Sequence, residues 1–119
     1  MKLTCNRQEL TQALSNVQRA VSSKSSIPAL EGILLRTDGS MLIICGYDLE
    51  IGMTTGIEAS CSETGSVVLN ARLFADIIRR LPEDSVLIMS DEKNVTTIVS
   101  GQSQFSIPGI PAEEYPELP

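Results

Sequence analysis

The chain has 119 residues, 42% of them hydrophobic, so it is long enough to form one domain with its own core. It contains no histidine, which removes the commonest general base and the Ser-His and Cys-His nucleophile pairs. The net charge of −6 argues against a protein that coats nucleic acid over its whole surface.

The first half of the chain predicts a strand, a helix and three further strands. Met1–Cys5 alternates like a strand, and Asn6 with Glu9 three residues later is a helix start signal. The helix is expected to continue to about Val21, because apolar residues recur with helical spacing at Leu10, Ala13, Leu14, Val17 and Val21. Strand-like runs then follow at Leu30–Arg36, Met41–Cys45 and roughly Leu49–Ala59, with Asp38-Gly39 as a hairpin turn.

The second half repeats this order. Ser66–Leu69 predicts a strand, Asn70 is a candidate helix cap, and Pro82 ends the helix soon after Leu81. Three strand-like runs complete the unit, at Ser85–Met89, Val95–Ser100 and Gln104–Ile107. Two βαβββ repeats predict an α+β fold with both helices on one face of a mainly antiparallel sheet. The helix residues expected to be buried against that sheet are Leu10, Leu14, Val17, Leu73, Ile77 and Leu81.

Residues 108–119 form a proline-rich acidic end. They hold four of the six prolines together with Glu113, Glu114 and Glu117, a composition that excludes a helix or a central strand. We expect the start of an extended linker to a second domain that this chain does not contain, with an ordinary frayed terminus as the alternative.

Charge is segregated along the chain. Residues 6–24 and 70–81 contain six basic and two acidic side chains, whereas the remainder contains three basic and thirteen acidic ones. If both helices lie on one side of the sheet, Arg19, Arg72 and Arg79 share a surface with uncharged polar residues. Such a surface suits sequence-independent contacts to a sugar-phosphate backbone, and an ordinary solvated helix face is the alternative.

No other group of residues in the sequence predicts a catalytic, metal-binding or cofactor-binding site. The three cysteines, Cys5, Cys45 and Cys61, are widely spaced without a C-x-x-C pattern, so we interpret them as small apolar residues. Paired carboxylates such as Asp48 with Glu50 are interpreted as turn and strand-edge charges, and the Ser-rich loop 22–26 lacks the glycines of a phosphate-binding loop. We therefore expect no catalytic residues, no metal and no cofactor. The absence of an apolar run of about 18 residues predicts a soluble cytoplasmic protein with no membrane partner.

Several short motifs, in this order and spacing, resemble the beta subunit of bacterial DNA polymerase III. They are M-K-L-T (Met1–Thr4), I-P-A-L (Ile27–Leu30), G-Y-D-L-E (Gly46–Glu50), N-A-R-L-F (Asn70–Phe74), R-L-P (Arg80–Pro82), G-Q-S-Q-F-S-I (Gly101–Ile107) and Y-P-E-L-P (Tyr115–Pro119). The resemblance spans the whole chain and implies the DNA-clamp fold, in the first of three similar domains. It also implies a head-to-tail dimeric ring around double-stranded DNA that serves as a processivity factor, with a clamp loader and a replicative polymerase as partners.

The resemblance also assigns roles to individual residues. Lys24 and Arg72 stand where members of that family contact DNA, although Lys24 replaces a common arginine and so lacks its bidentate fork. Phe105 and Ile107 stand in the apolar part of the ring-closing interface, so we expect both to lie on or beside an edge strand and to leave apolar surface exposed in this chain. Two further interpretations remain open, a non-catalytic protein-interaction or scaffold domain of another system and an enzyme.

Overall fold

Residues 1–118, which the computed structural model describes, form two successive units with the same order of elements. The first unit consists of β1 (Lys2–Asn6), α1 (Arg7–Val17), β2 (Gly32–Asp38), β3 (Met41–Tyr47) and β4 (Gly52–Glu63). The second consists of β5 (Ser66–Asn70), α2 (Ala71–Arg79), β6 (Ser85–Ser90), β7 (Thr96–Ser100) and β8 (Ser103–Ile107). Short 3-10 helices lie at η1 (Gln18–Ala20), η2 (Pro28–Glu31) and η3 (Ala112–Glu114). The predicted βαβββ repeat is confirmed.

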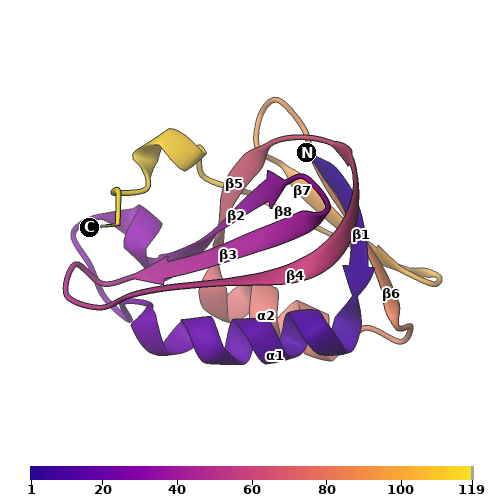
Figure 1. The fold of residues 1–119 in the computed structure, drawn as a ribbon, viewed down its shortest axis with the longest axis horizontal. Helices are drawn as coiled ribbons and strands as arrows, with labels where there is room; N and C mark the ends of the chain where they lie inside the picture. Colours follow the sequence, from indigo (N-terminus) through magenta and orange to yellow (C-terminus); the bar gives the residue numbers. More distant parts are fainter. Residues whose placement is uncertain (119) are drawn as a thin grey trace.

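The strands form one antiparallel sheet in the order β5-β2-β3-β4-β1-β6-β7-β8, which curves around the core (Figure 1). The long strand β4 joins the two units, because it pairs with β3 from Gly52 to Glu58 and with β1 from Ala59 to Glu63. After β8 the chain returns to the opposite end of the sheet. There Ile110 exchanges backbone hydrogen bonds of 2.8 and 3.0 Å with Val68 of β5. The sheet is therefore nearly closed.

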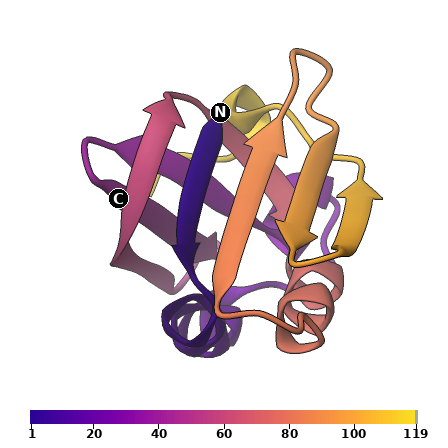
Figure 2. The same cartoon turned by 90° about the vertical axis from the view of Figure 1, so that its right-hand side faces the viewer.

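The two helices lie side by side on one face of the sheet, as Figure 2 shows from their ends. Each begins at an asparagine whose side chain accepts a backbone N–H, that of Glu9 for Asn6 and that of Leu73 for Asn70. Their apolar stripes enter the core with strand residues such as Leu3, Ile33 and Ile88. The buried residues of the two helices are Leu10, Ala13, Leu14, Val17, Ala71, Phe74, Ala75, Ile77 and Ile78.

Two sequence-based expectations about burial are wrong. Leu73 is 44% exposed. Phe74 and Ile78 set the inward direction of α2, and Leu73 is rotated by about 100° from Phe74 on the helix, so it lies on the exposed flank. Ile107 is only 7% exposed, whereas we expected it to leave apolar surface open. Its side chain belongs to the main hydrophobic core, with residues of both helices and of the other strands.

The C-terminal segment also differs from the expected extended linker. Over residues 108–118 it packs on the face of the sheet opposite the helices, where Tyr115 and Leu118 join Leu30, Tyr47 and Val68 in a second apolar cluster. The Tyr115 hydroxyl donates a hydrogen bond of 3.4 Å to the Cys45 carbonyl. Pro119, the last residue of the predicted linker, lies outside the described residues. That the segment leads to a second domain stays a prediction.

Candidate nucleic-acid interface

We call the sides of α1, η1 and α2 that face away from the sheet the helix surface; Figure 2 shows the two α-helices side by side beneath the sheet. Its exposed side chains include Gln12, Ser15, Arg19, Arg72 and Arg79, and two carboxylates lie on the same helices, Glu9 in the first turn of α1 and Asp76 on α2. The exposed positions of these side chains follow from the helical period, because helix residues that lie outside the buried apolar stripe point away from the core. The predicted placement of the three arginines on an exposed surface is confirmed.

Lys24 lies at the end of this surface, in the loop that follows η1. The backbone on both sides of it is held in place, since the Ser22 hydroxyl donates to the Lys24 carbonyl at 2.8 Å and the Ile27 N–H donates to the Ser25 hydroxyl at 3.0 Å. The Ser22 N–H also donates to the Leu30 carbonyl at 3.1 Å. The loop therefore has a defined path, and it presents the exposed Lys24 side chain to solvent.

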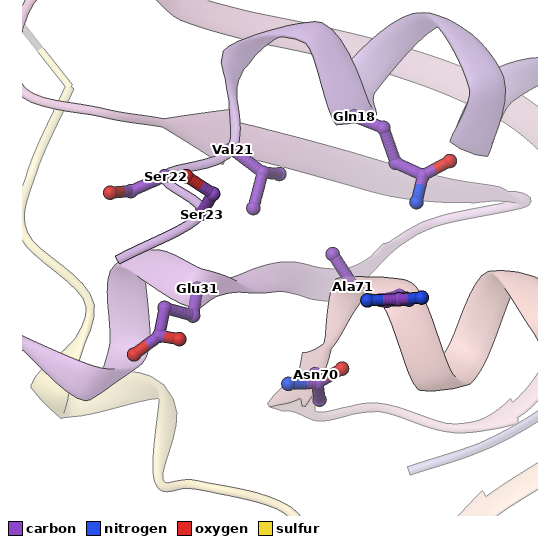
Figure 3. A pocket seen from close by; sticks show the side chains of 8 residues that line it. Gln18, Val21, Ser22, Ser23, Glu31, Asn70 and Ala71 are labelled. Carbon is purple, nitrogen blue, oxygen red and sulfur yellow. The ribbon is translucent and has the colours of Figure 1, made fainter. Parts of the chain in front are cut away.

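Arg72 lies in the first turn of α2, across an open hollow from this loop. The hollow has a volume of about 530 Å³ and is lined by Gln18, Val21, Ser22, Ser23, Glu31, Asn70, Ala71 and Arg72. Figure 3 shows its labelled side chains coming from η1, the following loop, η2 and the start of α2. The structure thus brings the beginning of α2 and the loop of Lys24 to one region, although they are far apart in sequence.

Ion pairing distinguishes the basic residues of the helix surface. Arg79 forms an ion pair with Asp76 on the same helix, three residues before it. Within residues 1–118, Arg19, Lys24 and Arg72 have no carboxylate within ion-pair distance. These three cations are therefore the more available to an external anion.

Glu31 is a residue of this region that the sequence-based reasoning missed. It is half-buried in η2 and lines the same hollow as Arg72, so it brings a negative charge to a hollow whose other lining residues are basic or uncharged. The only signal in the sequence was its position directly after the I-P-A-L motif. A carboxylate there disfavours deep entry of a phosphate into the hollow and favours contact at its rim.

The geometry of the helix surface suits contact with phosphate groups better than it suits catalysis or metal binding. The arginines lie along helix sides packed against a sheet, so neither helix projects to enter a major groove. Within residues 1–118 no group of three or more His, Cys, Asp or Glu side chains is arranged to hold a metal ion. The acidic pairs have structural roles, as expected. The Asp48 carboxylate accepts the N–H groups of Ile51 and Glu50, which lower its pKa, and Asp91 accepts those of Lys93 and Val95.

The predicted ring-closing residues lie at the free end of the sheet. Among residues 1–118, strand β8 pairs only with β7, so its outer edge is open. Phe105 on this strand is 38% exposed, as expected, while Ile107 is covered. No helix among the described residues is long and apolar enough to cross a membrane.

Comparison with known proteins gives one consistent family. The family model described as DNA polymerase III beta subunit, N-terminal domain, matches residues 1–119. The Beta sliding clamp of Synechococcus elongatus is 39% identical over 121 aligned residues, which cover 100% of this chain and 32% of the relative. The Beta sliding clamp of Streptomyces coelicolor is 35% identical over 119 residues, covering 100% of this chain and 31% of the relative.

Solved structures agree with this result. The crystal structure of the DNA polymerase sliding clamp from Bacillus subtilis has a TM-score of 0.97 at 33% identity, covering 100% of this chain and 33% of that one. A sliding clamp from Caulobacter crescentus has a TM-score of 0.93 at 30% identity, with the same coverage. The chain therefore spans about a third of the length of the relatives that it matches.

Proposed function

The chain belongs to the DNA polymerase III beta subunit family, as its N-terminal domain, and we propose that it works as one domain of a ring-shaped sliding clamp. The ring encircles duplex DNA and keeps a replicative polymerase on its template. The proposal extends to the whole protein what the names of relatives say of them, since this chain covers about a third of their length.

The helix surface is the observation that carries this proposal. Its exposed arginines and short polar side chains face one direction, while most carboxylates lie on other parts of the chain. An inner wall of this kind attracts the phosphate backbone and has no element that reads base edges, so DNA can move along it. The acidic remainder disfavours binding of DNA to the outside of the ring.

Within that wall we assign the main phosphate contacts to Lys24 and Arg72, which are exposed and have no ion-pair partner within residues 1–118. Arg19 is likewise exposed and without an ion-pair partner in that part of the chain, so we assign it a supporting phosphate contact. Arg79 contributes less, because Asp76 already neutralises part of its charge. These contacts would be electrostatic and would need neither a metal nor a cofactor.

The open edge of β8 is proposed as the ring-closing surface. Phe105 offers exposed apolar area on a strand whose outer edge is open, which suits pairing with a strand of a second protomer in a head-to-tail dimer. Ile107 would support that strand from the core side. The residues after it would lead into the second domain. The domain would act as a non-enzymatic cytoplasmic accessory of the polymerase and its clamp loader.

The test uses the full-length clamp polypeptide that carries this domain, loaded onto circular duplex DNA by its cognate clamp loader. The ring should stay on the closed circle in moderate salt and be released when a restriction enzyme linearises the DNA, because enclosure and not affinity retains it. A Phe105→Asp variant should form fewer dimers and be retained poorly on both DNA forms. Equal retention of the unmodified protein on circular and linear DNA would argue against a clamp.

A further inference from the structure

Glu31 is fixed beside the start of α2 by the packing of its neighbours. Leu30, directly before it, is buried in the second apolar cluster. Gly32, directly after it, pairs with Asn70, the residue that caps α2. No larger residue fits at Gly32, because a Cβ there would lie 2.7 Å from the Leu69 carbonyl oxygen. The backbone on both sides of Glu31 therefore has little freedom to move.

The carboxylate of Glu31 lies next to the helix surface without a counter-charge. Its side chain is half-buried and lines the same hollow as Arg72 (Figure 3). Within residues 1–118 no basic side chain lies within ion-pair distance of Glu31. Among the residues that line the hollow, Glu31 is the only acidic one and Arg72 the only basic one. Two opposite charges therefore border one open space of about 530 Å³ without forming an ion pair.

A phosphate that binds Arg72 is repelled by this carboxylate. The repulsion grows as the phosphate moves from the rim into the hollow, because the energy between two charges varies inversely with their distance. A half-buried carboxylate is also screened less by salt than a fully exposed one. Arg72 is therefore kept from the close, two-pronged contact with phosphate that a guanidinium can otherwise make.

A weak phosphate contact favours movement along DNA. A protein that moves on a duplex must break each phosphate contact before it makes the next one, so a tighter contact slows the movement. Asp76 limits Arg79 through a direct ion pair, whereas Glu31 faces Arg72 across open space. We propose that Glu31 limits the strength of the Arg72 contact and thereby keeps the domain mobile on DNA; this rests on the proposed function.

Duplex binding by the 119-residue chain tests the proposal. Glu31→Gln keeps the shape of the side chain and removes its charge, so the affinity at low salt should increase by about threefold. The logarithm of affinity should also fall more steeply with the logarithm of salt concentration, by up to about 0.9 in slope, which is the contribution of one phosphate contact. An unchanged affinity and slope would overturn the proposal.

A matched control separates this local effect from a change of net charge. Glu92 is exposed in the turn between β6 and β7, away from the helix surface. Glu92→Gln changes the net charge by the same amount and should alter the duplex affinity much less than Glu31→Gln does. Equal gains in the two variants would show that only the overall charge matters, and would contradict the proposal.

A double variant shows whether Glu31 acts through Arg72. The gain from Glu31→Gln should largely disappear when Arg72 is already replaced by alanine, because the contact that Glu31 limits is then absent. A full gain in that background would contradict the proposal. A carboxylate beside a helix N-terminus can also stabilise the helix. A lower thermal midpoint of Glu31→Gln with unchanged affinity would assign Glu31 that structural role instead.

The full-length clamp polypeptide provides the functional measurement. Rings that carry Glu31→Gln, loaded on duplex DNA by the cognate clamp loader, should diffuse along it about threefold more slowly than unmodified rings, because a tighter contact raises the barrier to each step. Equal diffusion of the two rings on DNA that they enclose would overturn the proposal and leave the proposed function standing. The affinity gain in the short chain, with a full-length protein that encloses no DNA, would support the limit on Arg72 while the proposed function fails.

Discussion

Arg72 and Arg79 lie on the same side of α2, seven residues apart, but their charges are not equally free. Arg79 is paired with Asp76, and Arg72 has no such partner within the described part of the chain. An arginine that already pairs with a carboxylate must give up part of that interaction to bind a phosphate. The residue type alone therefore does not predict which basic side chain of the helix surface is most available to bind a phosphate.

Single substitutions in α2 should separate these two arginines. We expect Arg72→Ala to reduce the duplex affinity of the 119-residue chain more than Arg79→Ala does. The salt dependence of binding should also weaken more in Arg72→Ala, by roughly the contribution of one phosphate contact. Asp76→Ala should increase the affinity, because it removes a negative charge and releases Arg79. Fluorescence anisotropy at low salt measures all three. Equal losses for both arginines would show that the ion pair does not matter in solution.

Leu73 and Ile78 differ in burial although they have the same number of carbon atoms and lie on one helix. Ile78 is fully buried, and Leu73 lies on the exposed flank. Ile78→Ala should lower the free energy of unfolding by about 2–5 kcal/mol, whereas Leu73→Ala should lower it by less than about 1 kcal/mol. Urea unfolding of the two variants gives the comparison. Similar costs would mean that the inward direction of α2 is wrongly assigned.

The buried thiol of Cys5 makes the free energy of unfolding depend on pH in the alkaline range. Burial raises the pKa of its thiol from 9.0 to about 12, and the charge of Glu9 and that of Cys61 add to the increase. Burial also raises the pKa of Tyr115. Since the unfolded chain releases these protons at lower pH than the folded chain, their contribution to stability is fully present below about pH 9 and is lost as pH rises towards 12.

The free energy of unfolding should therefore fall between pH 9 and about pH 11. Cys5→Ala should be less stable at neutral pH, because packing is lost, but its stability should fall less steeply over the same pH range. Urea titrations at several pH values measure both slopes. An unchanged slope in Cys5→Ala would exclude this thiol as a cause of the pH dependence.

At the scale of elements, the C-terminal segment is a structural part of the domain. Tyr115 is buried against the outer face of the sheet, and its hydroxyl bonds to the Cys45 carbonyl. We expect Tyr115→Ala to lower the free energy of unfolding by about 3 kcal/mol or more and Tyr115→Phe by about 1 kcal/mol. Chemical denaturation of the 119-residue chain tests this. A fully stable Tyr115→Ala variant would mean that the segment is only loosely attached.

The order and type of the elements could be predicted from local patterns, because caps, periodicity and turn residues act within a few residues of chain. Helix α1 ends at Val17 and not near Val21, since η1 continues the same apolar stripe in a tighter helix that periodicity does not distinguish. The return of Ile110 to Val68 could not be predicted, because it depends on partners far away in sequence. The burial of Ile107 depends likewise on packing in the main core with residues far away in sequence.

In the candidate site, too, local features could be predicted from the sequence, whereas contacts between distant residues could not. The helical period placed Arg19, Arg72 and Arg79 outside, because exposure on a packed helix is a local consequence of the apolar stripe. The pairing of Arg79 with Asp76 and the position of Glu31 depend on which side chains meet in three dimensions. The hollow between the loop of Lys24 and the start of α2 likewise exists only once both units have packed together.

At the scale of the whole molecule, the repeat gives the domain two distinct features. Both helices lie on one side, so basic residues from separate halves of the chain meet on one surface of an acidic protein. Among residues 1–118, the outer edge of β8, the last strand of the second unit, is also open. We expect a single domain to attract duplex DNA weakly, whereas retention would need several domains to enclose it.

The salt dependence of duplex binding by the 119-residue chain tests the assignment of the helix surface most directly. With about three phosphate contacts, the logarithm of affinity should fall with the logarithm of salt concentration with a slope of roughly −2.7, without sequence preference. Replacing Lys24 and Arg72 together by alanine should flatten the slope by roughly 1.8 and weaken all sequences alike. Tight binding at physiological salt, a clear preference for one sequence, or an unchanged slope in the double variant would contradict the assignment.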